Sequence, residues 1–125
     1  MELIIGGAYQ GKTDFAKENF NIADGEILVC DSDKEPVFDK KCITHLERFS
    51  FWCIEHGLEP KDYFFEHAKN LEHSIIIADD ISCGIVPINK AERAWREAHG
   101  RLMIKLSKDA EHVTRIFCGL AQRLK

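Results

Sequence analysis

The sequence predicts an α/β fold in which helices flank an open, mainly parallel sheet within one domain, residues 1–125. Short apolar runs typical of buried strands alternate along the chain with segments in which apolar residues recur at helical spacing. A content of 45% hydrophobic and 30% charged residues indicates a chain that folds, and its length suits a single domain. We therefore expect four strands that alternate with four helices through right-handed crossovers.

The first element is an apolar strand at residues 3–5, followed by a glycine-rich loop and by a helix over residues 13–20. The loop has the spacing G-x-x-x-x-G-K-[ST], formed by Gly6, Gly7, Ala8, Tyr9, Gln10, Gly11, Lys12 and Thr13. Its glycines let the backbone approach a phosphate closely, and its free N–H groups point at the anion together with the start of the helix.

This loop predicts a P-loop NTPase-like domain that binds ATP or GTP with Mg²⁺. Lys12 is expected to reach the β- and γ-phosphates, and the Thr13 hydroxyl is expected to bind the metal. The alternative is a glycine-rich turn that binds nothing, but the strand, the complete motif and the helix occur together.

The middle of the chain predicts a strand at residues 27–30, then helices over residues 38–56 and 60–71. Cys42, Leu46, Phe49 and Cys53 recur at helical spacing in the first of these helices, and Pro60 begins the second. Three histidines lie eleven residues apart, at positions 45, 56 and 67. The helix break at residues 57–60 separates them, which favours ordinary surface or half-buried histidines over a metal site.

A second informative stretch is the β-branched strand at residues 74–78, which ends in Asp79 and Asp80. An acidic strand end next to a phosphate loop predicts carboxylates near Mg²⁺ and the triphosphate. The alternative is a core strand followed by an acidic turn. An apolar loop follows at residues 81–89, then a helix over 89–107 with Asn89 as N-cap, and a last strand at 112–119.

Composition excludes several classes of function. A net charge of −4 without a basic block argues against nucleic-acid binding. No apolar run approaches the roughly 20 residues of a membrane span, and the N-terminus does not resemble a signal peptide. The five cysteines form no C-x-x-C pair and are expected to be reduced thiols of a cytoplasmic protein.

Residues 3–16 and 75–125 resemble the adenosylcobinamide kinase / adenosylcobinamide-phosphate guanylyltransferase family of cobalamin assembly. The phosphate loop is similar to that family's Gly-Gly-Ala-Arg-Ser-Gly-Lys-Ser. The family motif Asn-Glu-Val-Gly-x-Gly-Ile-Val-Pro aligns without gaps on residues 79–87, which read Asp-Asp-Ile-Ser-Cys-Gly-Ile-Val-Pro. An arginine-bearing helix, here with Arg93, Arg96 and Arg101, and a closing Leu-Lys follow in both.

The resemblance implies a kinase that phosphorylates the aminopropanol hydroxyl of adenosylcobinamide, with Lys12, Asp79 and Asp80 as catalytic residues. Thr13, Asp79 and Asp80 would hold Mg²⁺, and the substrate loop would be Gly84, Ile85, Val86 and Pro87. The family also transfers GMP through a modified histidine, for which His45 is the nearest candidate; an ordinary helix histidine is the alternative. The resemblance further implies a homo-oligomer, a trimer.

Three departures keep other functions open. The middle of the chain is shorter than in the family, the family's strand ending in Asp-Cys-Leu-Thr-Leu-Trp has no evident counterpart, and the residues flanking His45 are mostly not basic. The alternatives are a nucleotide-binding protein of corrinoid metabolism without transferase activity, and a kinase of another small alcohol. The sequence does not distinguish ATP from GTP.

Overall fold

The computed structural model describes residues 1–81 and 89–125. Six strands of this part form one sheet: β1 (Glu2–Gly6), β2 (Ile27–Val29), β3 (Cys42–Thr44), β4 (Ile75–Asp79), β5 (His112–Phe117) and β6 (Leu120–Arg123). Their order is β2-β3-β4-β1-β5-β6, and every neighbouring pair is parallel except β5 and β6. The predicted α/β class with a mainly parallel sheet is confirmed.

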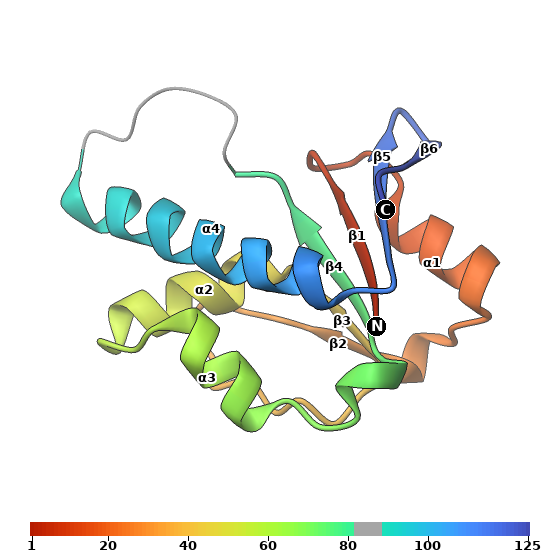
Figure 1. Cartoon of the computed structure of the whole chain (residues 1–125). Helices are drawn as coiled ribbons and strands as arrows, with labels where there is room; N and C mark the ends of the chain where they lie inside the picture. The colour runs from red at the N-terminus through yellow and green to blue at the C-terminus, as the bar shows by residue number, and fades with distance from the viewer. Residues whose placement is uncertain (82–88) are drawn as a thin grey trace.

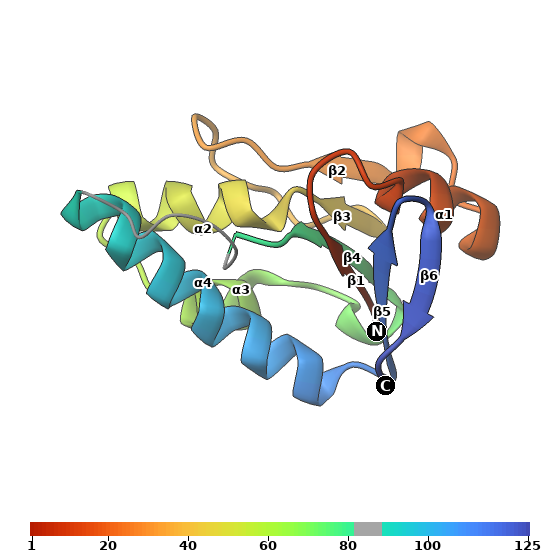
Figure 2. The same cartoon turned by 90° about the horizontal axis from the view of Figure 1, so that it is seen from above.

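Four helices pack on the sheet: α1 (Lys12–Phe20), α2 (Leu46–Glu55), α3 (Pro60–His67) and α4 (Lys90–Asp109). Helix α1 lies on one face, and α2, α3 and α4 cover the other (Figures 1 and 2). Short 3₁₀ turns at Asp24–Glu26 and Leu71–His73 lead into β2 and β4. The side chain of Asn89 accepts a 2.7 Å hydrogen bond from the Glu92 N–H, as expected of the N-cap of α4.

Strand β1 occupies the middle of the sheet and pairs with β4 on one side and β5 on the other. Successive side chains point to opposite faces: Leu3 joins the core under α2, α3 and α4, whereas Ile4 joins the core under α1. Both faces are therefore buried, which explains the unbroken apolar run in the sequence. Because the central strands are parallel, their carboxyl ends meet at one edge of the sheet, next to the phosphate loop.

The larger core lies under α2, α3 and α4 and is rich in aromatic rings. Phe38 contacts Phe49 and Phe64 edge to face, with ring centroids 5.2 Å apart in both pairs. Phe38 belongs to no helix, although it is buried. Its burial ties the irregular segment before β3 to the helices.

The predicted helix over residues 38–56 is wrong in its first part. Residues Cys42–Thr44 form β3, and α2 begins only at Leu46. Cys42 and Ile43 are both buried, but on opposite faces of the sheet, as the two-residue period of a strand requires. Cys42 lies four residues before Leu46, so it extended the helical pattern of α2 by coincidence.

The tail expected after the last strand is instead β6. Cys118 and Gly119 form a two-residue turn with φ of 51° and 76°, which are the positive angles that a tight β-hairpin needs. This hairpin gives the sheet its single antiparallel pair among the described strands. The sheet thus has two strands more than we expected, and α3 ends at His67 rather than near residue 71.

Candidate functional site

The predicted phosphate loop connects β1 to α1. Gly11 has φ of 89°, in the left-handed region that favours glycine. A Cβ at Gly6 would lie 2.5 Å from the carbonyl oxygen of Ile116, so only glycine lets β1 pass β5 at this point. Gln10 fixes the far side of the loop, because its side chain and its carbonyl accept hydrogen bonds from the N–H groups of Cys118 and Gly119.

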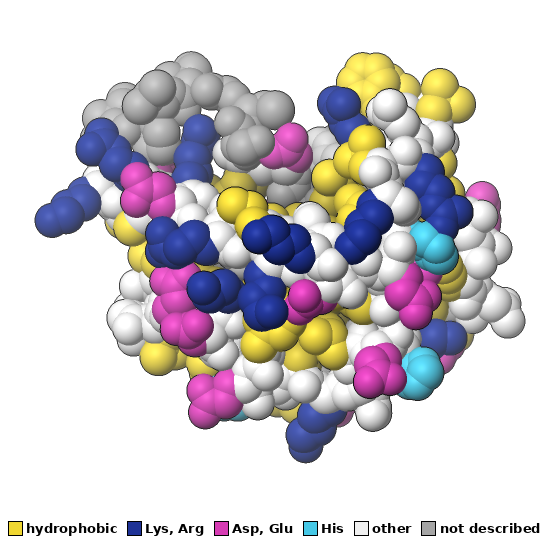
Figure 3. Space-filling view, in the orientation of Figure 1, with side chains coloured by type: hydrophobic (Ala, Val, Ile, Leu, Met, Phe, Trp, Pro, Cys, Tyr) yellow, Lys and Arg dark blue, Asp and Glu magenta, His cyan; other side chains and the backbone are white. Residues whose placement is uncertain are grey.

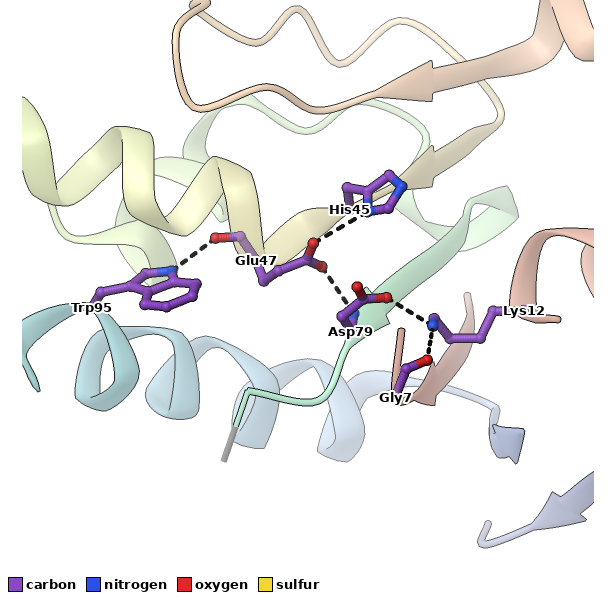
Figure 4. A network of polar contacts seen from close by, with 6 residues as sticks. All are labelled: Gly7, Lys12, His45, Glu47, Asp79 and Trp95. Atoms are coloured by element: carbon purple, nitrogen blue, oxygen red, sulfur yellow. Dashed lines mark hydrogen bonds and ion pairs between the residues drawn. The ribbon is translucent and has the colours of Figure 1, made fainter. Parts of the chain in front are cut away.

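Lys12 is the first residue of α1, and its side chain folds back under the loop. Its Nζ lies 2.7 Å from Oδ1 of Asp79 and donates a hydrogen bond to the carbonyl of Gly7 (Figure 4). Lys12 is only 6% exposed, so this ion pair is largely removed from water. The lysine of the motif and the acidic end of β4 are therefore in direct contact.

A buried carboxylate, Glu47, connects Asp79 to His45. Its Oε1 accepts a 2.8 Å hydrogen bond from the Asp79 N–H, and its Oε2 lies 3.2 Å from Nδ1 of His45 (Figure 4). The backbone carbonyl of Glu47 also accepts a 2.8 Å bond from the indole of Trp95 on α4. Glu47 is thus held at three points while it orients the histidine.

His45 stands between β3 and α2, at the carboxyl edge of the sheet. It has φ of 57°, a left-handed conformation that lets the chain turn sharply from strand to helix. The expectation that His45 lies within a helix is therefore wrong. Its half-exposed ring faces the same pocket as the phosphate loop.

The pocket beside the loop has a volume of about 380 Å³. Its lining comes from three parts of the fold: residues 8–14 of the loop and α1, residues 44, 45 and 48 at the start of α2, and Ile77 and Asp79 of β4. Predicted site residues Lys12, Thr13, His45 and Asp79 meet here. Nitrogen and oxygen atoms of His45, Glu47 and Asp79 lie within 4.8 Å of one another, close enough to hold a cation together.

A second, larger cavity of about 740 Å³ lies on the other side of Asp79, against α4. In the space-filling view the surface is hollowed between α4 and the β5–β6 hairpin, and hydrophobic side chains lie along the hollow (Figure 3). Asp79 lines both cavities, whereas Asp80 lines only this one. The Asp80 N–H donates a 2.7 Å hydrogen bond to the carbonyl of Gly6, which fixes the end of β4 against the phosphate loop.

The wall of this α4 cavity contains a buried histidine, His99. Its Nδ1 lies 2.7 Å from the hydroxyl of Ser50 on α2, and both residues are almost completely buried. Burial lowers the pKa of His99 to about 4, although the charge of Asp80 acts in the opposite direction. Within the described ranges, Nε2 of His99 and Nε of Arg96 are buried and make no hydrogen bond.

The remaining predicted residues lie elsewhere. The substrate loop Gly84, Ile85, Val86 and Pro87 lies outside the described residues. Arg101 makes two hydrogen bonds to Glu59 on the surface, of 2.9 and 3.0 Å, and lines neither cavity. His56 and His67 contact backbone carbonyls four residues before them, so the three spaced histidines do not converge.

The cysteines are free thiols in the described part of the chain. Burial raises the pKa of Cys30 and Cys53 to about 12 and that of Cys42 to about 11, so these thiols stay protonated. Cys118 is exposed in the turn between β5 and β6. No helix in the described ranges has both the length and the apolar character to cross a membrane.

Sequence reasoning missed Glu47 and Arg48, which lie in the first turn of α2. Arg48 is exposed and lines the pocket beside the phosphate loop. The signal in the sequence was short: the run at residues 42–44, with two β-branched residues, is followed by the polar residues His45 and Glu47 on either side of a leucine. Because the predicted helix includes His45 and Glu47, it puts their side chains on different helix faces. The two residues were therefore not connected with the phosphate loop.

Comparison with protein families gives one match that bears on the site. Residues 55–124, more than half of the chain, match the model described as cobinamide kinase / cobinamide phosphate guanyltransferase. The matched part contains β4, α4 and the β5–β6 hairpin, whereas the phosphate loop, His45 and Glu47 precede it. No curated protein matches the chain.

Proposed function

The chain belongs to the cobinamide kinase / cobinamide phosphate guanyltransferase family of cobalamin biosynthesis, and we propose that it catalyses both reactions of that name. One observation carries the proposal: a single pocket is lined by the phosphate loop, by His45 and by Asp79, and Asp79 also borders the larger α4 cavity. A nucleotide and an acceptor alcohol bound in these two spaces would meet at the end of β4.

In the kinase step, the aminopropanol hydroxyl of adenosylcobinamide attacks the γ-phosphorus of ATP or GTP. The bond to the β-phosphate oxygen breaks, and the nucleoside diphosphate leaves. The loop N–H groups and Lys12 neutralise the charge that develops on the phosphates. Asp80, which lines the acceptor side, would orient the hydroxyl and accept its proton.

The donor set suits Mg²⁺ at the phosphate side. The Thr13 hydroxyl and the Asp79 carboxylate line the same pocket, and Mg²⁺ prefers oxygen ligands of this kind. The carboxylate of Asp79 is paired with Lys12, so it becomes available to a cation when Lys12 turns to the phosphates. When bound, the metal would offset the negative charge of the phosphates.

In the guanylyl step, Nε2 of His45 attacks the α-phosphorus of GTP, and diphosphate leaves. A phosphate oxygen of adenosylcobinamide phosphate then attacks the histidine-bound GMP, the P–N bond breaks, and the GDP-linked corrinoid forms. Glu47 supports this role, because its carboxylate accepts a hydrogen bond from Nδ1–H of His45. That contact leaves Nε2 without a proton and able to act as the nucleophile.

The direct test is incubation of the protein with Mg·GTP and adenosylcobinamide, with corrinoid products and the peptide containing His45 identified by mass spectrometry. We expect adenosylcobinamide phosphate, then the GDP-linked product, and a GMP adduct on that peptide. Bound nucleotide without any corrinoid product would overturn the proposal and favour a nucleotide-binding protein without transferase activity.

His45→Asn separates the two steps. Asparagine adopts the left-handed conformation of position 45 readily, so the backbone turn is preserved, while the nucleophilic ring is lost. We expect phosphorylation within about threefold of the unchanged protein and loss of the adduct and of the GDP-linked product. A GDP-linked product from this variant would exclude His45 as the nucleophile.

Two further expectations stay predictions. A homotrimer, which the family resemblance implies, can be checked by light scattering of the purified chain. A cytoplasmic location can be checked by fractionation of cells that express it.

A further inference from the structure

We propose that the α4 cavity is the acceptor subsite and that His99 recognises a neutral amide of the corrinoid there. This inference rests on the proposed function, because it names the part of the molecule that receives the alcohol. It concerns residues of α4 and α2 that lie outside the phosphate-loop pocket.

The position of the cavity is the first argument. Asp79 belongs to the walls of both cavities, and Asp80 follows it on the α4 side. A hydroxyl that reaches the γ-phosphate from the α4 side would pass these two carboxylates. The volume of about 740 Å³ falls in the usual range of small-molecule sites, which is roughly 300–1,000 Å³.

The composition of the wall is the second argument. Ile5, Met103 and Ile104 give the cavity an apolar lining on which a large, weakly polar molecule can pack. Ile104 remains 60% exposed although it is a large hydrophobic residue, as expected for the rim of such a site. Among the described residues of the wall, the cations Arg96 and Lys108 are offset by Asp79, Asp80 and Glu97, so the wall has no net positive charge that would attract a nucleoside triphosphate. The apolar residues would instead cover the hydroxyl-bearing arm and the edge of a macrocycle.

His99 is the third argument, because one of its two ring nitrogens has no partner. Nδ1 is occupied by Ser50, while Nε2 is buried in the cavity wall without a hydrogen bond to the described residues. A buried polar atom without a partner costs free energy, and a ligand that supplies the partner recovers it. Such an atom marks a place at which a ligand is recognised.

The chemistry of His99 selects a neutral ligand group. Its pKa of about 4 keeps the imidazole uncharged at neutral pH, so it cannot attract a phosphate by charge. Nε2 is a donor in one tautomer and an acceptor in the other. An amide offers both an N–H and a carbonyl, and the buried Nε–H of Arg96 on the same wall adds a second donor for a carbonyl. Corrinoid side chains are amides.

Gly100 provides a test that does not disturb the core. It lines the cavity, and a Cβ at this position would meet no heavy atom within 4 Å. Gly100→Phe should therefore fill the cavity and weaken adenosylcobinamide binding at least about tenfold, while nucleotide affinity stays within twofold. Gly100→Ala, with a single added carbon, should give a smaller loss.

Gly25→Phe is the matched control, because it makes the same substitution at another open position, outside both cavities. It should bind adenosylcobinamide and nucleotide as the unchanged chain does. Separate titrations with adenosylcobinamide and with GTP measure the two affinities, and the KM for adenosylcobinamide in the kinase step checks the first. Equal corrinoid binding by Gly100→Phe and the unchanged chain would overturn the acceptor subsite.

Two substitutions of His99 test the amide contact. His99→Asn places an amide near the position of Nδ1 and keeps a partner for Ser50, whereas His99→Gln places one near Nε2. We expect His99→Asn to raise the KM for adenosylcobinamide about three- to tenfold with kcat nearly unchanged, and His99→Gln to restore most of that loss. Circular dichroism and nucleotide titration establish that both variants fold.

The outcomes separate the two proposals. No corrinoid product from the unchanged chain would overturn the proposed function itself. Product formation by the unchanged chain, together with equal KM values for His99→Asn and His99→Gln, would overturn the amide contact alone.

Discussion

The two sides of the end of β4 differ in how their polar groups are satisfied. On the phosphate side, Lys12, Asp79, Glu47 and His45 form a continuous network in which each contacts the next. On the α4 side, buried nitrogens of Arg96 and His99 make no hydrogen bond within the described residues. The polar groups of this network on the phosphate side thus have partners without a ligand. On the α4 side, two buried nitrogen atoms are left for a ligand to bind.

Because of this difference, we expect ligand binding to have a different free-energy cost on the two sides. A nucleotide must displace the Lys12–Asp79 ion pair before its phosphates can use the lysine, so the site exchanges one set of contacts for another. An acceptor on the α4 side can supply partners to Nε of Arg96 and Nε2 of His99, which make no hydrogen bond within the described residues. We expect substitutions on the phosphate side to affect rate, and those on the α4 side to affect affinity and stability.

The largest effect is expected from Lys12→Ala. The substitution removes the ammonium group that pairs with Asp79 and leaves that carboxylate unneutralised beside the triphosphate. Turnover should fall about 10³-fold or more, measured as corrinoid product per unit time. Lys17→Ala is the control, since Lys17 pairs with Asp24 on the surface of α1 and should retain the original rate. Retained turnover in Lys12→Ala would contradict the role of the phosphate loop.

A smaller and more selective effect is expected from Glu47→Gln. Glutamine can still accept the Asp79 N–H, but it no longer holds the proton on Nδ1 of His45. The imidazole then shifts toward the tautomer that carries its proton on Nε2, which is not nucleophilic. Formation of the GMP adduct should slow about 10²-fold, while the kinase step changes less than about tenfold. Equal slowing of both steps would mean that Glu47 acts only through Asp79.

The smallest effect is a dependence of stability on pH that comes from the α4 side. Burial holds the pKa of His99 at about 4, below its usual value near 6.5. Between these two pH values the unfolded chain binds a proton at this histidine and the folded chain does not, so acid favours unfolding. From pH 7 to 4.5 this histidine should remove about 2–3 kcal/mol of the free energy of unfolding.

Urea denaturation at both pH values measures this loss, with His99→Gln as the comparison. The variant lacks the titrating ring, so its stability should fall less on acidification by about the same 2–3 kcal/mol. An equal fall in both proteins would show that other groups cause the acid sensitivity.

The sequence predicted those parts of the fold in which local pattern and tertiary structure agree. The phosphate loop, β4 with its acidic end, and α4 with its Asn89 cap were all found, because each has a motif or a period of its own. Strand β3 was missed, since three residues are too few to establish a two-residue period against the helical pattern that follows. Strand β6 was missed because all four of its residues are exposed and carry no apolar alternation.

The candidate site was predictable only in part, for a related reason. Lys12 and Thr13 belong to a contiguous motif, and Asp79 follows a recognisable strand. The contact between Glu47 and the Asp79 N–H joins residues 32 positions apart and depends on the placement of β3 beside β4. His99 and Ser50, 49 positions apart, meet only because α4 packs on α2. Nothing in either local sequence distinguishes that pair from an ordinary helix serine and histidine.

The position of β1 between β4 and β5 has a consequence for synthesis on the ribosome. The strand that precedes the phosphate loop is made before both of its neighbours, because Glu2 pairs with Ile75 on one side and with His112 on the other. An emerging chain can therefore pair β1 on its β4 side once residue 79 has been made, but its β5 side stays unpaired until residues 112–116 follow. The hydrogen bonds from the N–H groups of Cys118 and Gly119 to Gln10 can form only later still. The nucleotide site is completed late, although its motif precedes the strands that complete it.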